Sequence, residues 1–321
     1  MTLILREADV RRLLTMADTV RVVESAFAQL AAGAATNTPR SRIVLPQGRG
    51  VLHMLAGAAP EQGVLGYKAY TAFRTGVRFV VMLYSSEDGR LLAAIEADWL
   101  GQMRTGAASG VATRHLARAE ANLVGVIGTG GQARTQLMAV CAVRPIKMAQ
   151  VYGRDAARRE AFCREMGALL GIEARPVETA EAAVRAAEIL ITATTAREPV
   201  VRGEWLPDGA HVNAMGSNWA DRRELDGAAV RRAALVAVDD PAQARLEAGD
   251  LVLAAAEGSF DFASAVPLAE IVAGKRPGRE RPDAVTLFKS LGIGLEDVAT
   301  AGHLYTLARE QGVGQELDFL P

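Results

Sequence analysis

The sequence is poor in cysteine, in aromatic residues and in net charge. Only two of its 321 residues are cysteines, Cys141 and Cys163, and they form neither a Cys-x-x-Cys pair nor another metal-ligand spacing. Two isolated cysteines argue against a disulfide framework and favour a reducing compartment. The 36 basic and 37 acidic residues leave a formal net charge of −1, so no overall field attracts nucleic acid. We therefore expect a cytoplasmic protein whose partner is a small molecule.

Long apolar runs and grouped histidines are also missing. No stretch approaches the roughly 20 apolar residues of a membrane span, and residues 1–7 lack the pattern of a signal peptide. The four histidines show no His-x-x-x-His or His-Glu spacing. We expect neither a metal site nor a membrane partner. Half of the residues are apolar, which is enough for one large or two medium domains with buried cores.

The N-terminal third predicts a helix followed by a mostly antiparallel sheet. Apolar residues recur at steps of three and four over 18–32, which predicts a helix with Asp18 as its N-cap and Gly33 just past its end. Strands are predicted at 42–45, 51–55 and 79–84, and the turn 86–89 predicts a hairpin to 91–95. A second helix is predicted over 97–116.

From residue 123 the pattern alternates between strand and helix. Strands are predicted at 123–127, 149–152, 189–193, 211–215 and 234–238, and helices at 131–143, 156–170 and 295–310. The short apolar strands are typical of a parallel sheet buried on both faces. The basic stretch 274–282 is predicted to be a solvated loop. The fold class is therefore α/β, with a Rossmann-type doubly wound sheet and a smaller α+β domain.

A dinucleotide-binding fingerprint joins the first of these strands to its helix. Gly128-x-Gly130-x-x-Ala133 directly follows the apolar strand 123–127. Gly128 permits the tight turn, Gly130 leaves room for the pyrophosphate, and Ala133 allows close packing of helix and strand. The N–H groups at the helix start face the phosphates. We expect NADP or NAD to bind here.

The end of the second parallel strand indicates which cofactor binds. A carboxylate at this place suits the 2′-hydroxyl of NAD, whereas an arginine suits the 2′-phosphate of NADP. Gly153 occupies the usual acidic position and Arg154 follows it, so a guanidinium is available for a phosphate. We expect NADP, and Asp155 keeps NAD as the alternative.

Several stretches together resemble the ornithine cyclodeaminase and mu-crystallin family over nearly the whole chain. They are 38–40, 66–68, 103–107, the glycine loop, 213–217, 224–226, 247–250 and 288–297. The resemblance implies a homodimer, with a substrate-binding and dimerisation domain at 1–116 and 300–321 and a Rossmann domain at 117–299. It places the catalytic cleft between these domains. Family activities include cyclisation of ornithine to proline, amino acid dehydrogenation and reduction of cyclic ketimines.

Four cations of the smaller domain suit a carboxylate-bearing amino or imino acid. Arg40, Arg42, Lys68 and Arg104 lie in or beside apolar segments, where a cation needs an anionic partner. Arg104 and Arg40 are expected to hold the substrate carboxylate, with Arg42 able to replace Arg40. Lys68 is expected to bind the same group or to exchange a proton with the reacting nitrogen. Structural salt bridges are the alternative role for these residues.

The candidate sites follow from the fingerprint and the resemblance together. The loops 192–195 and 216–218 follow predicted sheet strands and are expected to face the nicotinamide. The catalytic candidates are Lys68, Arg104 and Asn218. The cofactor-binding candidates are Thr105, Gly128, Thr129, Gly130, Gly131, Gln132, Ala133, Arg154, Thr192, Thr194, Met215 and Gly216.

Two departures from the family pattern bear on the reaction. Cyclodeaminases carry an aspartate where this chain has Asn218, and an amide cannot act as a general base. Asp221 lies three residues further on and is the alternative source of a carboxylate. Leu55-Ala56 replaces the usual Met-Pro, which alters the expected substrate pocket. We therefore expect a reductase or dehydrogenase of the C–N bond, with ornithine cyclodeaminase and a non-enzymatic ligand-binding protein as alternatives.

Overall fold

The computed structural model describes residues 1–319, and the chain forms two compact units. Unit 1 comprises Met1–Arg104 and Gly292–Pro321, and unit 2 comprises Thr105–Leu291. The divisions expected from the sequence, after residues 116 and 299, therefore differ from those of the compact units. The first division falls inside a helix, whereas the sequence pattern marks only where a helix ends.

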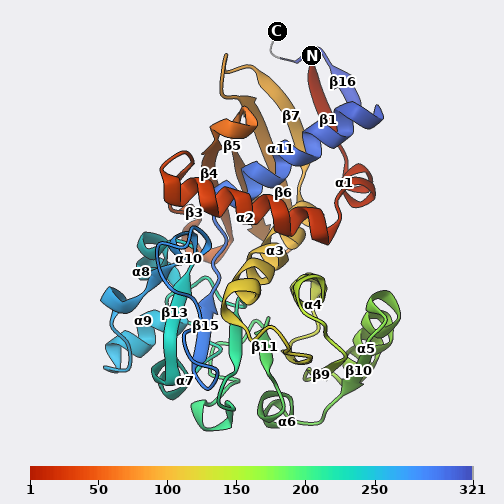
Figure 1. The fold of residues 1–321 in the computed structure, drawn as a ribbon. Helices are drawn as coiled ribbons and strands as arrows, with labels where there is room; N and C mark the ends of the chain where they lie inside the picture. Colours follow the sequence, from red (N-terminus) through yellow and green to blue (C-terminus); the bar gives the residue numbers. More distant parts are fainter. Residues whose placement is uncertain (320–321) are drawn as a thin grey trace. The chain divides into compact units, whose positions relative to one another are not determined.

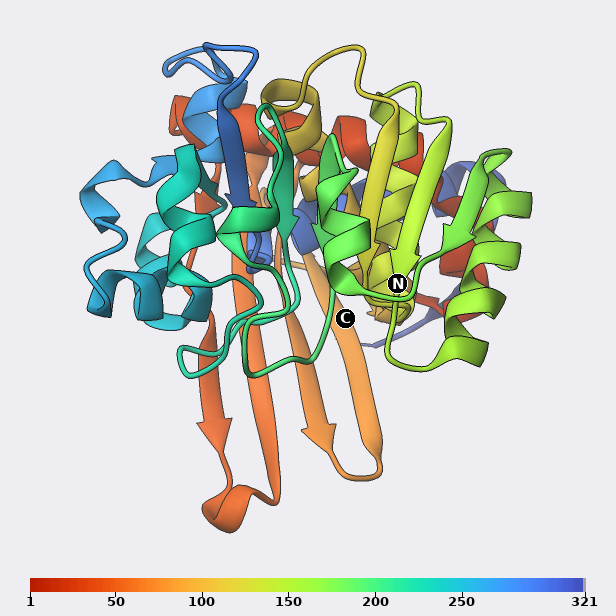
Figure 2. The same ribbon diagram turned by 90° about the horizontal axis from the view of Figure 1, so that it is seen from below.

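Unit 1 is built on a mostly antiparallel sheet (Figure 1). The strand order is β16-β1-β7-β6-β5-β4-β2, and β3 pairs with β4. The strands are β1 (Thr2–Leu5), β2 (Thr36–Asn37), β3 (Ser41–Val44), β4 (Gly50–Ala59), β5 (Val64–Phe73), β6 (Gly76–Ser85), β7 (Leu91–Glu96) and β16 (Gln315–Leu317). The long strands β4, β5 and β6 run side by side and are orange in Figure 2. The predicted hairpin of β6 and β7 is confirmed.

The helices of unit 1 are α1 (Glu7–Leu13), α2 (Met16–Ala32), the first part of α3 (Asp98–Leu116) and α11 (Gly294–Gln311), with short 3-10 turns η1 (Pro46–Gly48) and η2 (Pro60–Gln62). Helix α2 confirms the predicted amphipathic helix, and Gly33 ends it in the left-handed conformation with a φ of 73°. The predicted N-cap is wrong. Thr15 caps the helix by accepting a hydrogen bond from the N–H of Asp18, because α2 begins earlier than its apolar pattern.

The two faces of the unit 1 sheet differ in what covers them. Helix α11 packs on β4, β5 and β6, on the face that carries the buried side chains of Leu55, Lys68 and Val81. Strand residues alternate between faces, and directly paired residues share one. Met54 and Val80 both pair with Ala69, so they lie on the opposite face of the sheet. Both side chains are exposed, so this face of the unit 1 sheet carries exposed apolar residues.

Unit 2 contains a parallel sheet in the order β10-β9-β8-β11-β12-β15-β13-β14. Its strands are β8 (Leu123–Ile127), β9 (Met148–Tyr152), β10 (Glu173–Pro176), β11 (Ile189–Thr192), β12 (His211–Ala214), β13 (Ala233–Val238), β14 (Val266–Pro267) and β15 (Val285–Lys289). The doubly wound α/β fold is confirmed. The order reverses between β8 and β11, where such folds bind ligands beyond the carboxyl ends of the strands.

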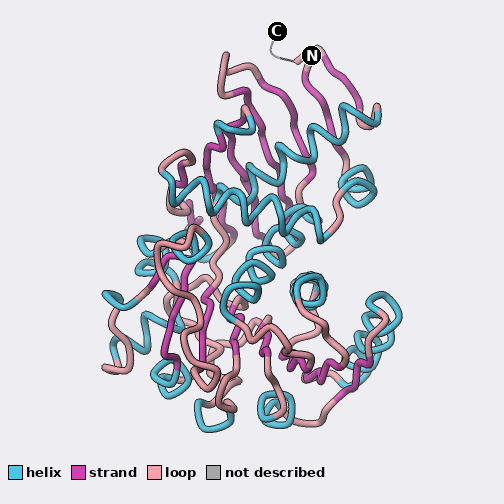
Figure 3. The backbone as a smooth tube through the Cα atoms, in the orientation of Figure 1, coloured by secondary structure: helices cyan, strands magenta, loops and turns pink. Residues whose placement is uncertain are grey.

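The remaining helices cover both faces of this sheet (Figure 3). They are α4 (Gly131–Val143), α5 (Ala156–Leu170), α6 (Ala180–Arg185), α7 (Gly227–Arg232), α8 (Pro241–Glu247), α9 (Gly249–Ala256) and α10 (Leu268–Val272), with 3-10 turns η3 (Gly203–Trp205) and η4 (Phe262–Ser264). Ile189 and Ile191 pack with α4 and α5, whereas Leu190 packs with α6 and α7. The strands are thus apolar on both faces, as the sequence predicted.

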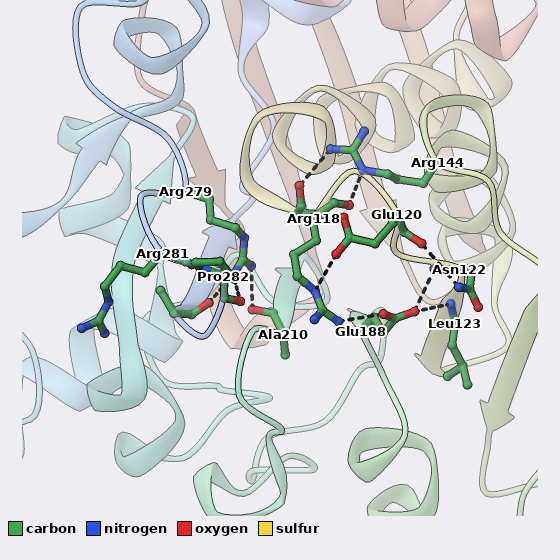
Figure 4. A network of polar contacts seen from close by, with 12 residues as sticks. Arg118, Glu120, Asn122, Leu123, Arg144, Glu188, Ala210, Arg279, Arg281 and Pro282 are labelled. Carbon is green, nitrogen blue, oxygen red and sulfur yellow. Dashed lines mark hydrogen bonds and ion pairs between the residues drawn. The ribbon is translucent and has the colours of Figure 1, made fainter.

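Two arginines, Arg144 and Arg279, donate hydrogen bonds to carbonyl groups at the end of α3. Figure 4 labels both of them. Arg144 donates to the carbonyls of Thr113, Arg114 and Ala117 at 2.8–2.9 Å. Arg279 donates to that of Leu116 at 2.7 Å. The last carbonyls of a helix lack partners within it, and these side-chain donors supply hydrogen bonds there. Thr113 also accepts from the N–H of Ala117 at 3.0 Å. The interpretation of 274–282 as a solvated loop is therefore wrong for Arg279, because its guanidinium donates hydrogen bonds to backbone carbonyls.

Glu188 fastens the start of the parallel sheet in the same region (Figure 4). Its carboxylate accepts from the N–H groups of Asn122 and Leu123, at 2.8 and 3.1 Å, and from Arg118 at 2.7 Å. Since Glu188 immediately precedes β11 and Leu123 begins β8, the two strands at the topological reversal are fixed relative to each other.

Candidate functional site

The glycine loop between β8 and α4 has the shape that a dinucleotide needs. Gly128 has a φ of 115°, and a Cβ atom there would lie 2.3 Å from the carbonyl oxygen of Ala193. Only glycine fits this turn. At Gly130, by contrast, a Cβ atom would meet nothing within 4 Å. Gly130 is the N-cap of α4 and has no side chain to satisfy the first N–H groups, so open space adjoins free donors. These residues fit a pyrophosphate.

The end of β9 carries a guanidinium at the position where Rossmann folds bind the cofactor ribose. A side chain at Gly153 would come within 2.9 Å of Thr129, which explains the absence of the usual carboxylate. Arg154 is exposed. Asp155 caps α5 by accepting from the N–H of Arg158 at 3.1 Å, so its carboxylate already has a structural task.

The candidates Thr192, Thr194, Met215 and Gly216 lie where β11 and β12 end. Thr192 is fully buried, and its hydroxyl donates to Glu224 rather than pointing into solvent. Asp221, the alternative carboxylate, has a side chain that is 73% exposed and 3.8 Å from Arg222. A buried carboxylate does contact these loops, but it is that of Glu224, which the sequence reasoning did not select.

Lys68 and Arg104 form a buried charge cluster in unit 1 with two carboxylates of α11. Lys68 Nζ and Arg104 Nε both donate to Oδ1 of Asp297, each at 2.8 Å. Arg104 Nη1 donates to Oε2 of Glu296 at 2.8 Å. The close approach of Arg104 requires Gly292, since a Cβ atom there would lie 2.1 Å from Nη1. The structure thus brings together two predicted cations and two carboxylates that the sequence reasoning did not assign.

The cluster changes the acidity of both cations. Burial, reinforced by the charge of Arg104, lowers the pKa of Lys68 to about 7, although Asp297 acts in the opposite direction. Burial alone would also lower the pKa of Arg104, but Asp297 and Glu296 outweigh it and raise that pKa. Arg104 is therefore a permanent cation, whereas Lys68 can exchange a proton near neutral pH.

Arg40 and Arg42 lie beside a stacked pair of rings. His53 and Tyr70 stack with ring centroids 4.3 Å apart. Arg40 donates to the hydroxyl of Tyr70 at 2.7 Å and to the carbonyl of Gly292 at 3.2 Å. Arg42 Nε donates to Nδ1 of His53 at 3.2 Å, which assigns the ring proton to Nε2. Burial and the nearby cations lower the pKa of His53 to about 3, so the ring is neutral.

Within residues 1–319, no group of three or more His, Cys, Asp or Glu side chains is arranged to hold a metal ion. No described helix is long and apolar enough to cross a membrane. Both cysteines are free thiols, and burial raises the pKa of Cys141 to about 12. Neither cysteine is therefore a candidate nucleophile at neutral pH.

Comparisons with known proteins cover nearly the whole chain. The model of the ornithine cyclodeaminase/mu-crystallin family matches residues 1–312. A Delta(1)-pyrroline-2-carboxylate reductase of Bacillus cereus is 32% identical over 99% of this chain and 100% of its own length. The alanine dehydrogenase of Archaeoglobus fulgidus is also 32% identical, over 99% of this chain and 98% of its own.

A solved structure is similar in backbone as well as in sequence. It is that of Thermococcus litoralis Delta(1)-pyrroline-2-carboxylate reductase in complex with NADH and L-proline. The two chains are 39% identical and superpose with a TM-score of 0.95, over 98% of this chain and 100% of the other.

Proposed function

Because the chain belongs to the ornithine cyclodeaminase/mu-crystallin family, we propose that it reduces the C=N bond of a cyclic imino acid with NADPH. In coarser terms, it is an NAD(P)-dependent enzyme acting on the C–N bond of a small amino or imino acid. One observation carries the choice of reductase over cyclodeaminase. The loop 216–223 offers Asn218 and an exposed Asp221, so it supplies no buried carboxylate for the second half of a cyclodeaminase reaction.

In this proposal, the cations of unit 1 bind the carboxylate of the substrate. Arg104 uses Nε and one N–H of Nη1 for Asp297 and Glu296, and its guanidinium carries three further N–H groups. Arg40, held by Tyr70, is the second arginine for the same carboxylate. His53 is neutral and adds no charge to this region. The positive charge that attracts the substrate carboxylate therefore comes from the arginines and Lys68.

Lys68 handles the proton. A lysine whose pKa is about 7 is partly an ammonium group at neutral pH and releases its proton readily. Asp297 fixes Nζ at 2.8 Å and favours the charged form before the reaction. When bound, the reduced nicotinamide supplies a hydride to the carbon of the C=N bond. Lys68 gives a proton to the nitrogen, so the imine becomes an amine, and solvent then reprotonates the lysine.

The residues at the ribose position support NADPH over NADH. Arg154 offers a cation for the 2′-phosphate, and Asp155 is engaged at the start of α5. The glycine loop and the start of α4 hold the pyrophosphate.

We also propose a homodimer in the cytoplasm. The exposed face of the unit 1 sheet carries apolar side chains on adjacent strands, including Ile43 (55% exposed), Met54 (38%), Leu65 (39%) and Val80 (37%). An apolar patch of this kind indicates a protein interface. The structure of the archaeal alanine dehydrogenase, 32% identical to this chain, is described as a dimer. The two free thiols support the reducing cytoplasm expected from the sequence.

The test follows nicotinamide absorbance and ammonia in parallel. We expect one NADPH to be oxidised per Delta(1)-pyrroline-2-carboxylate consumed, and no ammonia to be released from ornithine with NAD. Keto acids with ammonia or methylamine serve as open-chain competitors in the same assay. Ammonia release from ornithine without net change in absorbance would establish a cyclodeaminase instead. Saturable binding without turnover of any substrate would establish the ligand-binding alternative.

A further inference from the structure

A single buried carboxylate joins the loops that follow β11 and β12 in unit 2. Oε2 of Glu224 accepts from the hydroxyl of Thr192 at 2.7 Å and from the N–H of Gly216 at 2.8 Å. Oε1 accepts from the N–H of Thr194 at 2.7 Å. Glu224 is fully buried. One side chain thus fixes three donors on two separate loops.

The approach of Glu224 determines which residue can occupy position 216. A Cβ atom on Gly216 would lie 2.3 Å from Oε1 of Glu224 and 2.5 Å from the carbonyl oxygen of Thr194. Any larger residue would push the carboxylate away from its donors. Glycine at this position is therefore explained by the contact with Glu224.

Two more buried charges hold Glu224 in place. Asp250 Oδ1 accepts from the backbone N–H groups of Glu224 and Leu225, at 2.6 and 2.9 Å. Lys289, at the end of β15, forms an ion pair of 2.8 Å with Asp250 and donates to the carbonyl of Ser217 at 2.7 Å. Burial and the charge of Asp250 raise the pKa of Glu224. Burying two carboxylates and one ammonium group costs free energy of folding. Fixing the position of the two loops therefore explains these buried charges better than a gain in stability does.

The loops concerned lie at the carboxyl ends of parallel strands, beside the reversal of strand order between β8 and β11. Ligands of doubly wound sheets bind at these ends. We propose that Glu224 is a positioning residue for the nicotinamide half of the cofactor, setting the loops 192–195 and 215–218 at once. This inference rests on the proposed NAD(P)-dependent function.

The test compares Glu224→Gln with Asp226→Asn. An amide retains the shape of the carboxylate but replaces one acceptor oxygen by a donor, so one loop N–H loses its partner. Asp226 is the matched control, because its carboxylate also accepts two backbone N–H groups, those of Gly203 and Ala229, away from the two loops. Both bonds to Asp226 go to Oδ1, so an asparagine amide oxygen can keep them, and this variant controls for replacing a backbone-binding carboxylate by an amide. Only Glu224→Gln alters the proposed cofactor site.

Binding is measured by calorimetry with the reduced cofactor that the unmodified protein prefers and with the matching ADP-ribose fragment, which lacks nicotinamide. We expect Glu224→Gln to raise the Kd of the whole cofactor by about tenfold and that of the fragment by less than about twofold. Asp226→Asn should change neither by more than about twofold. Hydrogen exchange of peptides covering 192–197 and 215–220 should be faster in Glu224→Gln without cofactor.

A second pair of variants keeps the inference testable if Glu224→Gln does not fold. Thr192→Val removes only the hydroxyl that donates to Glu224, whereas Thr192→Ser keeps it. We expect Thr192→Val to weaken whole-cofactor binding selectively and Thr192→Ser to resemble the unmodified protein. Equal losses for cofactor and fragment, or no loss for either, would reduce Glu224 to a purely structural role. Failure of the unmodified protein to bind any nicotinamide cofactor would instead refute the proposed function.

Discussion

At the scale of single residues, the pKa of Lys68 predicts how activity depends on pH. If the proposed reduction takes its proton from Lys68, kcat/KM should be high below pH 7 and fall as pH rises through about 7. Asp297 raises the pKa of Lys68, so Asp297→Asn should shift the fall to lower pH. Arg104 and Arg40 are the other charges acting on Lys68, and both lower its pKa.

Steady-state kinetics over a range of pH check this, with Asp18→Asn as a carboxylate control on α2 that leaves the inflection in place. Lys68→Met should abolish the inflection and reduce turnover by at least about a hundredfold. An unchanged inflection in Asp297→Asn would show that the titrating group is not Lys68.

Arg154 predicts the cofactor preference. A guanidinium paired with the 2′-phosphate is a charge-assisted contact, so NADPH should bind more tightly than NADH. Arg154→Ala should raise the Kd of NADPH by roughly tenfold and that of NADH by less than about twofold. Calorimetry measures both values, and Arg158→Ala is the control, being an arginine on α5 with an 80% exposed side chain. Equal affinity of the unmodified protein for the two cofactors would contradict the prediction.

The sequence could identify the cations of the candidate site but not the groups that surround them. Lys68 and Asp297 are 229 residues apart, and no spacing pattern relates positions so distant. The available signal was an acidic pair, Glu296 and Asp297, opening a helix directly after Gly292-Ile293-Gly294. The sequence signal for Glu224 is weaker. A glutamate between two arginines and a leucine resembles a surface residue, although the fold buries it.

At the scale of elements, the sequence predicts a helix or strand correctly when that element is apolar on one face or on both. Helices α4 and α5 begin and end at the expected residues, since Gly130, Asp155 and Gly171 mark their limits. Strand β5 was not predicted. Its covered face carries Lys68 and Gly66, a buried cation and a residue without a side chain, in place of an apolar row. A strand that contributes a functional group to the interior departs from the pattern by which strands are recognised.

The hydrogen bonds of Arg144 at the end of α3 predict that removing its guanidinium lowers the free energy of unfolding. Arg144→Met keeps most of the aliphatic stem but removes the guanidinium that donates to the carbonyls of Thr113, Arg114 and Ala117. We expect a loss of about 2 kcal/mol in the free energy of unfolding. Thermal unfolding should show this as a decrease in Tm of roughly 5 °C. Arg158→Met, which removes an exposed charge, should leave Tm unchanged, and equal Tm values for both variants would refute the capping role.

At the scale of the whole molecule, the exposed sheet face predicts the oligomeric state. Light scattering after size exclusion should give twice the mass of the chain. Leu65→Lys combined with Val80→Lys should give monomers, because charges on adjacent strands of an apolar interface cost more than the contact provides. Leu169 and Leu246 are more exposed, at 61% and 66%, but lie in unit 2 on α5 and α8. Leu169→Lys with Leu246→Lys is therefore the control and should remain dimeric; a dimeric sheet-face variant would rule out this interface.

The chain order of the two units has a consequence for biosynthesis. A ribosome completes residues 105–291, the whole of unit 2, before it makes α11 and β16. During that interval β1 lacks β16, the sheet lacks α11, and Lys68 and Arg104 lack the carboxylates of Asp297 and Glu296. Domains generally fold during synthesis from the N-terminus onward, but here the unit that begins first finishes last. Nascent unit 1 exposes an apolar sheet and two unpaired cations, so it is the stage at which a chaperone would be needed.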